Sequence, residues 1–407
     1  MTTPTVTPEL LDELASISAT LADPGVVRPS DDGRTGPQSL AGGAAGIALL
    51  HIERAVSGHG DPATANTWIR VAAGDPFGTG PAIDPFHGAP ALAFVLHTAR
   101  PLGGYRRAFA ALDDATITLT HQRLAAAHAR IDRRNPLTMH EFDLVHGLTG
   151  LGLYHLHAHP DHPISRGVVT YLDRLTEPLG DGSAQPPWWL SSGLGGTPHP
   201  DFPHGHGNIG AAHGISAVIA LLSYAVLRGH TTPEALDALA ILCDWTDQHR
   251  QDGPAGPWWP GYVTPDTSPR RHRPSWCYGT PGIARAQQLA GLALHDKARQ
   301  RRAEDAMLAD LQDATQRARL PEIGLCHGKG GLLQAACRMA AASTDPHRAV
   351  QLAAELPGLA RELATQLAAQ AHGDPELMNG AAGAALALHT ATVGTSATCW
   401  DTFLGLA

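Results

Sequence analysis

The chain of 407 residues has little charge, few aromatic residues and no long apolar run. Charged residues make up 16% and aromatic residues 5%, and no apolar stretch approaches the ~18 residues of a membrane span. Lys and Arg number 29 against 38 Asp and Glu, which gives a net charge of −9. Because nucleic-acid backbones are bound by clustered Lys and Arg, this balance argues against a nucleic-acid partner. The hydrophobic content of 43% argues against a mostly disordered chain.

Cysteine is also scarce, since the chain has only five. An odd number of cysteines in a long chain fits a reducing cytosol better than a disulfide framework. The first residues, Met1 to Glu13, lack the basic-then-apolar pattern of a signal peptide. The sequence therefore predicts a cytoplasmic protein.

A glycine followed three residues later by a small residue opens an apolar run seven times. We call these seven residues the anchor glycines and count neighbouring positions from them: Gly43, Gly88, Gly147, Gly214, Gly279, Gly328 and Gly380. The intervals between them, roughly 45 to 67 residues, each fit two helices of about 10–14 residues with their loops. The small residue is Ala in two copies, at Ala91 and Ala217.

The run after each anchor glycine is apolar nearly all round, which predicts a helix buried on both sides. Small residues in its first turn let backbones approach closely and leave N–H groups free at the helix start. More amphipathic stretches lie between the anchors, such as residues 232–248 and 348–371. Seven buried helices alternating with seven outer ones predict an all-α fold, an α/α toroid, as a single domain over residues 1–407. A two-layer helical solenoid or bundle is the alternative, because spacing does not show that a ring closes.

Two cysteines occupy equivalent positions in consecutive repeats, each two residues before an anchor glycine. They are Cys277 and Cys326, and His327 follows directly. Two thiolates and an imidazole are a typical three-ligand zinc set that leaves a fourth position open. The alternative is two small buried cysteines and one capping histidine, since free Cys is commonly a core residue. The remaining cysteines lack this register and are interpreted as core or surface thiols: Cys243, Cys337 and Cys399.

Three further residues are candidates for the chemistry beside such a metal. His213 directly precedes Gly214, and Asp143 lies four residues before Gly147, so both are expected at the same rim. An imidazole and a carboxylate beside a metal-bound thiol can transfer protons. Position alone does not single out His213, because other histidines also precede anchor glycines. Arg273, four residues before Cys277, is either a site residue that steadies a carboxylate or an ordinary surface arginine.

Two other polar segments have competing interpretations. His204 and His206 are spaced like metal ligands, but a solvated loop is the simpler explanation. Arg270 and Arg271 form a basic patch before the Cys277 segment and are predicted to contribute to peptide or leader binding, with a solvated basic turn as the alternative.

Three motifs carry a resemblance to a known family: Trp-Cys-Tyr-Gly-x-Pro-Gly at 276–282, Cys-His-Gly at 326–328 and Asn-x-Gly-x-x-His-Gly at 208–214. Together with the seven anchors, they make residues 42–387 resemble the lanthionine synthetase C-like proteins. The resemblance implies zinc held by Cys277, Cys326 and His327. It also implies acid/base roles for the residues matching His213 and Asp143, and a supporting role for the one matching Arg273. Residues 96–139 give no clear signal for a leader-binding subdomain and are treated as a candidate accessory segment.

Family members include cyclases of lantibiotic precursors. The resemblance therefore implies a zinc-dependent cyclase, in which cysteine thiolates of a peptide add to dehydroalanine or dehydrobutyrine residues and form thioether rings. The substrate would be a dehydrated precursor peptide of leader and core, and a dehydratase and a transporter are candidate partners.

Two other interpretations use the same residues. One is addition of glutathione or another thiol to dehydroamino acids, or a prenyltransferase-like alkylation of a thiol. The other is a zinc-stabilised peptide-binding scaffold without turnover. Ring formation leaves the peptide mass unchanged and removes thiols, whereas glutathione addition raises the mass.

Overall fold

A computed structural model describes residues 8–27, 36, 38–74, 83–178, 185–193, 197–230, 232–370 and 373–407. Helices account for about 60% of the described residues, and the strands among them are two or three residues long, which confirms the all-α prediction. The chain divides into two compact units. Unit 1 contains residues 1–116 and 314–401, with residue 407, and unit 2 contains residues 117–313 and 402–406.

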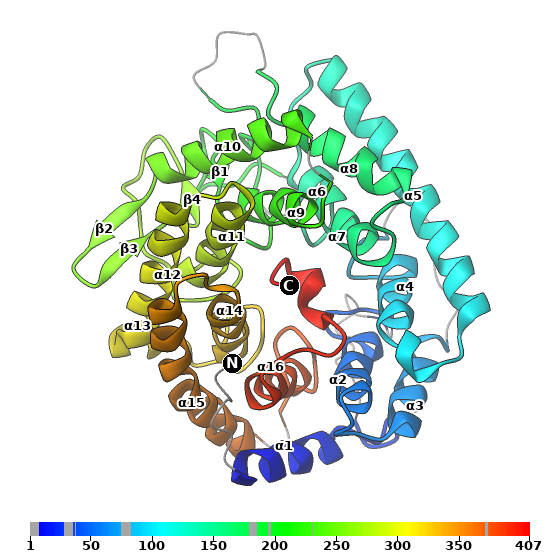
Figure 1. The fold of residues 1–407 in the computed structure, drawn as a ribbon. Coiled ribbons are helices and arrows are strands. Elements are labelled where there is room, and N and C mark those ends of the chain that lie inside the picture. Colours follow the sequence, from blue (N-terminus) through cyan, green and yellow to red (C-terminus); the bar gives the residue numbers. More distant parts are fainter. Residues whose placement is uncertain are drawn as a thin grey trace. The chain divides into compact units, whose positions relative to one another are not determined.

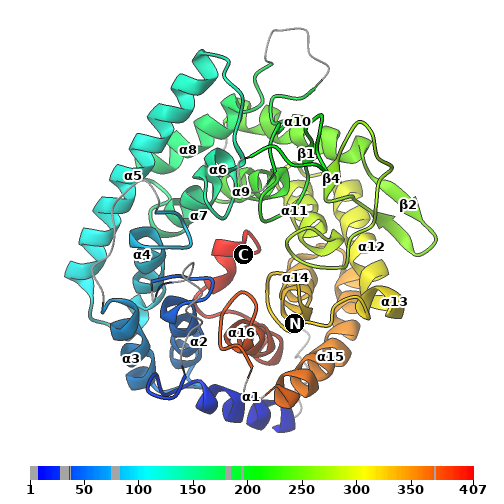
Figure 2. The ribbon, with the colours of Figure 1, turned by 180° about the vertical axis from the view of Figure 1, so that it is seen from behind.

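Unit 1 is built from helices of both ends of the chain (Figures 1 and 2). Its helices are α1 (Pro8–Thr20), α2 (Ala44–Val56), α3 (Pro62–Ala72), α4 (Ala89–Thr98), η1 (Arg100–Leu102), α13 (Ala314–Arg317), α14 (Lys329–Ala342), α15 (Pro346–Ala369) and α16 (Ala381–Val393). Helix α2 packs against α3, α4 and α16, and α16 packs against α14 and α15.

In unit 2, three helices form one layer and further helices cover them (Figure 1). Its elements are α6 (Met139–Phe142), α7 (Leu148–Ala158), α8 (Pro163–Arg174), β1 (Gly207–Asn208), α9 (Ile215–Leu227), α10 (Pro233–Gln248), β2 (Gln251–Gly253), β3 (Gly256–Trp258), β4 (Tyr262–Val263), α11 (Thr280–Ala293) and α12 (Lys297–Gln312). Helix α9 packs against α7 and α11, while α8, α10 and α12 cover them. Strand β1 pairs antiparallel with β4, and β2 with β3.

Helix α5 (Arg106–Asp132) contributes residues to both units, as does the short η2 (Trp400–Leu404). The candidate accessory segment 96–139 thus consists largely of this one helix, and its accessory role stays a prediction, as does the single domain over residues 1–407. None of the described helices combines the length and the apolar character that crossing a membrane requires.

Every anchor glycine is the N-cap of a helix, as the repeat pattern predicts. The anchored helices are α2, α4, α7, α9, α11, α14 and α16. Their partner helices begin differently, because a side chain caps them: Asp61 for α3, Thr232 for α10, Asp296 for α12 and Asp345 for α15. Helices α10 and α15 are the two amphipathic stretches expected at 232–248 and 348–371.

The glycines of the repeat are needed because backbone lies directly against them. A Cβ placed on Gly282 would come closer than 3.0 Å to the carbonyl oxygen of Trp276, and one on Gly383 would do the same at Leu377. The anchor Gly279 is similarly covered by the backbone of Ser275. We call the four residues before each anchor glycine the pre-anchor turn. The small residues of the repeat therefore allow a pre-anchor turn to pack directly against the first turn of an anchored helix.

At α14 and α16 the first N–H groups are not free, which differs from the sequence-based expectation for these two helices. At α14, Lys329 donates its N–H to the carbonyl of Glu322 at 3.0 Å, and Gly330 donates to Ile323 at 2.9 Å. At α16, Ala381 donates to the carbonyl of Asp374 at 2.8 Å. The chain before the pre-anchor turn supplies the acceptors that a helix start otherwise lacks.

A buried carboxylate fastens the end of unit 1 to its beginning. Glu53 on α2 is fully buried, and its carboxylate accepts the N–H groups of Ala397 at 2.7 Å and Thr398 at 3.0 Å. Nearby, the buried carboxylate of Asp401 is paired with Arg338 of α14. A buried carboxylate is stable only when such partners are in place, so residues 396–401 complete the core of this unit.

Replacing Gly383 by Ala tests the close-approach explanation. We expect a loss of about 1–3 kcal/mol in the free energy of unfolding, because the new methyl group meets backbone that cannot yield. Gly358, inside α15, is the matched control, since a Cβ there has nothing within 4 Å. Gly358→Ala should raise stability by about 0.5–1 kcal/mol through helix propensity. Urea unfolding measures both, and an unchanged midpoint for Gly383→Ala would contradict the explanation.

Candidate functional site

Consecutive pre-anchor turns are joined by backbone hydrogen bonds near the residue two positions before the anchor. In unit 2, Leu144 donates its N–H to the carbonyl of Ala212 at 3.3 Å, and Ala212 donates to Cys277 at 3.3 Å. In unit 1, Cys326 donates to Met378 at 2.9 Å, and Met378 donates to Ala41 at 3.0 Å. Equivalent positions in consecutive repeats, and in the last and the first repeat, are therefore neighbours within their unit.

Cys277 lies in the pre-anchor turn of α11 and is 8% exposed. Its carbonyl also accepts the N–H of Ala211 at 2.8 Å, and its sulfur lies 3.5 Å from the hydroxyl of Ser275. The thiol is thus held at the start of an anchored helix, with its backbone tied to the turn that carries His213.

Asp143 and His213 form a close pair. The carboxylate oxygen Oδ2 of Asp143 lies 2.5 Å from Nδ1 of His213, and Asp143 is fully buried while the His213 side chain is 18% exposed. The other oxygen, Oδ1, accepts the N–H of His146 at 2.7 Å. The carboxylate therefore fixes the imidazole of His213 through Nδ1.

Two further rings stack on His213. His146 lies at a centroid distance of 5.8 Å with an interplanar angle of 26°, and Tyr278 at 6.3 Å with 25°. Both are the last residue before an anchor glycine, as His213 is. This repetition was visible in the sequence, but which ring meets which depends on packing between repeats.

The other two predicted zinc ligands belong to unit 1. Cys326 and His327 are both half-buried and lie in the pre-anchor turn of α14. Cys243 does not share this setting, because it is fully buried on α10 and burial raises the pKa of its thiol to about 12. It is a core thiol, one of the two interpretations that the sequence leaves open.

The arginines before Cys277 have different surroundings. Arg273 is half-buried, and its role in the site stays a prediction. Arg271 makes an ion pair with Asp310 of α12 at 2.5 Å, in which Asp310 is 1% and Arg271 16% exposed. Arg270 is exposed. This ion pair gives Arg271 a structural role and argues against its prediction as a peptide-binding residue.

The two histidines with metal-like spacing do not share an environment. His204 is 68% exposed, as a solvated loop predicts. His206 is fully buried, and its ring stacks on Phe202 at 4.0 Å, so burial lowers its pKa to about 4. The interpretation of both as solvated was therefore wrong for His206, because β1 and the aromatic residues around it enclose that side chain.

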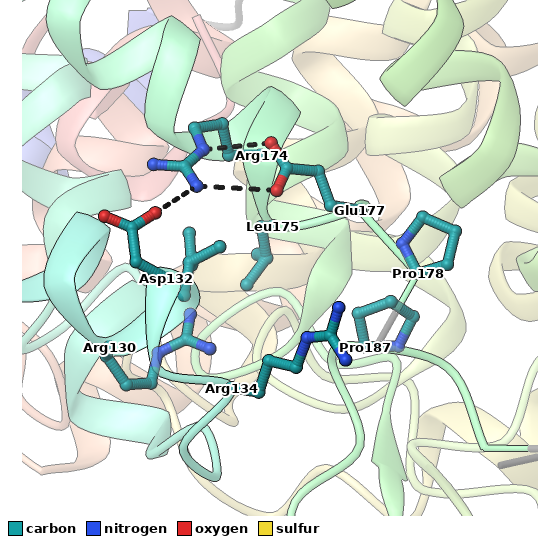
Figure 3. Close-up of a pocket in the computed structure, with 9 residues that line it drawn as sticks. Arg130, Asp132, Arg134, Arg174, Leu175, Glu177, Pro178 and Pro187 are labelled. Atoms are coloured by element: carbon teal, nitrogen blue, oxygen red, sulfur yellow. Dashed lines mark hydrogen bonds and ion pairs between the residues drawn. The ribbon is translucent and has the colours of Figure 1, made fainter. Parts of the chain in front are cut away.

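A pocket of about 210 Å³ lies in unit 2 where α5 and α8 end (Figure 3). Arg130, Arg134 and Arg174 line it with their guanidinium groups. Arg174 pairs with Asp132 at 2.8 Å and with Glu177 at 2.9 Å. None of the predicted site residues lines this pocket, so it is separate from the Asp143–His213 pair.

Comparison with known proteins identifies the family that the sequence motifs resemble. Residues 35–404 match the family described as lanthionine synthetase C-like protein. A curated relative, the nisin biosynthesis protein NisC of Lactococcus lactis subsp. lactis, is 24% identical over 208 residues. That alignment spans 49% of this chain and 49% of the relative, or about half the length of each.

A solved structure described as nisin cyclase is similar over nearly the whole chain. The TM-score is 0.77 at 18% sequence identity, and the alignment covers 98% of each chain. At this identity the likeness concerns the fold, and it confirms the predicted fold class, an α/α toroid.

Arg271→Ala tests the structural role of its ion pair. We expect a loss of about 3 kcal/mol in the free energy of unfolding, because the change removes a cation that pairs with the buried carboxylate of Asp310. Arg270→Ala is the control and should stay within about 0.5 kcal/mol of the unchanged protein, as exposed positions usually do. If Arg271→Ala unfolds at the same urea concentration as Arg270→Ala, the ion pair does not stabilise the fold.

Proposed function

Because this chain belongs to the lanthionine synthetase C-like family, we propose that it is a zinc-dependent lanthipeptide cyclase. It would add cysteine thiols of a dehydrated peptide to dehydroalanine or dehydrobutyrine residues of the same peptide, forming lanthionine and methyllanthionine rings. The names of its relative and of the similar structure support a peptide substrate of this class.

The observation that carries the proposal is an acid/base pair whose His213 turn is hydrogen-bonded to the turn that carries the Cys277 thiol. The Asp143–His213 contact of 2.5 Å and the hydrogen bonds from Ala211 and Ala212 to the Cys277 carbonyl belong to one unit. A buried scaffold thiol needs no carboxylate-oriented imidazole next to it. A reaction that moves a proton and uses a thiolate needs both.

We propose that Cys277, Cys326 and His327 hold one zinc ion. The support is the series of backbone hydrogen bonds that joins consecutive pre-anchor turns within each unit, and Cys277 and Cys326 occupy the same position in consecutive repeats. The donor set also fits the metal, since two thiolates and one imidazole are ordinary zinc ligands that leave room for a fourth. When bound, zinc lowers the pKa of a coordinated thiol and so supplies a thiolate at neutral pH.

The side chains of this chain would then handle the proton. Attack of the thiolate on the β-carbon of the dehydroamino acid forms a carbon–sulfur bond and leaves an enolate. His213, held through Nδ1 by Asp143, would deliver a proton to the α-carbon from its other ring nitrogen. Arg273 would steady the carbonyl oxygen on which charge develops. The proton lost by the thiol balances the one gained at carbon.

The partners and the location belong to the same proposal. The substrate is a precursor peptide with leader and core, already dehydrated by a separate dehydratase, and a transporter would export the product. The cytoplasm is the proposed place of action, because five cysteines in a long chain fit a reducing compartment better than a disulfide framework.

The zinc proposal predicts one ion per chain. After dialysis against metal-free buffer, Cys277→Ala and Cys326→Ala should each retain less than about a tenth of the zinc. Loss of a residue that only hydrogen-bonds to a metal ligand already weakens metal binding about tenfold or more, and loss of a ligand itself should weaken it at least as much. Cys243→Ala is the matched control and should keep its zinc. Elemental analysis gives the metal content and circular dichroism the helicity. Full zinc in Cys277→Ala would refute the ligand assignment.

The cyclase proposal predicts ring formation in a dehydrated precursor peptide. Its mass should stay constant while its thiols disappear, and addition of glutathione would instead raise the mass. His213→Ala should keep its zinc and slow cyclisation by about 10²–10⁴-fold, the usual contribution of a positioned proton donor. Asp143→Asn should also be slower, because the imidazole loses its orienting carboxylate.

His204→Ala is the control for these variants, since that imidazole is largely exposed and should be dispensable. Thiol titration with mass spectrometry follows the reaction over time. Normal rates in both His213→Ala and Asp143→Asn would remove the acid/base pair from the mechanism, and an unreacted peptide with the unchanged protein would remove the proposed function itself.

A further inference from the structure

A third residue joins the Asp143–His213 pair at ligand distance. One nitrogen of His146, one nitrogen of His213 and one carboxylate oxygen of Asp143 all lie within 4.8 Å of one another. The carboxylate is fully buried and both histidines are partly covered. Two imidazoles and one carboxylate are the same kinds of donor that hold catalytic zinc in three-ligand sites.

The three side chains are fixed by the backbone as well as by each other. The N–H of His146 donates to Oδ1 of Asp143 at 2.7 Å, and its carbonyl accepts a hydrogen bond from the guanidinium of Arg123. The N–H of Leu144 donates to Ala212 at 3.3 Å, which ties together the two turns that carry the donors. The two imidazole rings stack nearly parallel at 5.8 Å. Little chain reorganisation is therefore needed to bring all three donors to one ion.

We propose that Asp143, His146 and His213 form a second, weaker zinc site, and that an ion bound there inhibits the enzyme. Zinc–ligand bonds of about 2.0–2.2 Å place neighbouring donors a little over 3 Å apart. The 2.5 Å contact between Asp143 and His213 must then open slightly, while His146 closes in by rotating its side chain. This adjustment makes the site weaker than one with its donors already in place.

Occupancy of the second site and proton transfer exclude each other. An ion between Asp143 and His213 binds the Nδ1 lone pair, so the ring can give up its Nε2 proton only by becoming an imidazolate, which makes it a poor proton donor; the ion also neutralises the carboxylate that orients the ring. The inhibition rests on the proposed function, in which His213 supplies the proton. The binding of a second ion does not rest on it. Zinc should therefore activate the apoprotein at one equivalent and inhibit it when a second equivalent binds.

Zinc sulfate added to the full chain tests both parts. Equilibrium dialysis at rising zinc should give a second bound ion per chain, and the cyclisation rate should fall with the same midpoint. His146→Gln keeps the backbone N–H that holds Asp143 but loses a ligand. Its own cyclisation rate at one equivalent of zinc is the baseline from which its inhibition by further zinc is measured. Its second-site affinity and its sensitivity to inhibition should both fall at least about tenfold, as loss of even an outer-shell group does.

His140→Gln is the matched control. Its ring lies 4.5 Å from that of His146 but is not part of the three-donor group, so it should bind and respond to zinc like the unchanged protein. A chain that never exceeds one ion, or a second ion that binds His146→Gln as tightly, would overturn the site. A second ion that depends on His146 but leaves the rate unchanged would overturn the inhibition alone. If the unchanged protein forms no rings at all, the dialysis result still decides on the site.

Discussion

The structure depends on the close approach of backbone to backbone at the start of each anchored helix. A pre-anchor turn can lie on the first helical turn only if the facing residue has no side chain, as Gly282 and Gly383 show. Hydrogen bonds from the helix start then hold the preceding chain, and hydrogen bonds between turns align one repeat with the next. Reactive residues placed in these turns inherit the regular spacing of the helices. The fold thus acts as a scaffold on which a small set of positions can be varied without disturbing the core.

The anchors were predictable because close packing leaves a local trace in the sequence, a small residue at a fixed spacing. The same register marked Cys277 and placed His213 and Asp143 at the same rim, but position alone did not separate His213 from the other histidines that precede anchor glycines. The remaining features depend on what lies opposite in space. Nothing near Arg271 in the sequence shows that a buried carboxylate faces it from α12, and nothing near His206 shows that aromatic rings enclose it. Likewise, the acceptors that occupy the first N–H groups of α14 come from chain outside the repeat motif.

The candidate site also illustrates a general tension in proton-transfer chemistry. A carboxylate that orients an imidazole must be buried and close, as Asp143 is at 2.5 Å from His213. These conditions suit a cation as well as a proton, because both use the same lone pairs. Stacking His146 and Tyr278 on His213 limits the motion of the ring and shields it from water. The same stacking brings a nitrogen of His146 close to Asp143 and His213. The fixed positions of these side chains therefore suit both a proton and a metal ion.

The way unit 1 is assembled from both ends of the chain has a consequence for biosynthesis. Residues up to 116 leave the ribosome first, but their helix α2 carries the buried carboxylate of Glu53, whose partners are residues 397 and 398. At translation rates of about 5–20 residues per second, the intervening residues 117–313 take roughly 10–40 s to make. Unit 2 is nearly continuous in sequence and can fold during that time, whereas the N-terminal helices must wait with apolar surface uncovered. A growing chain of this protein is therefore a natural client for chaperones that shield nascent hydrophobic segments.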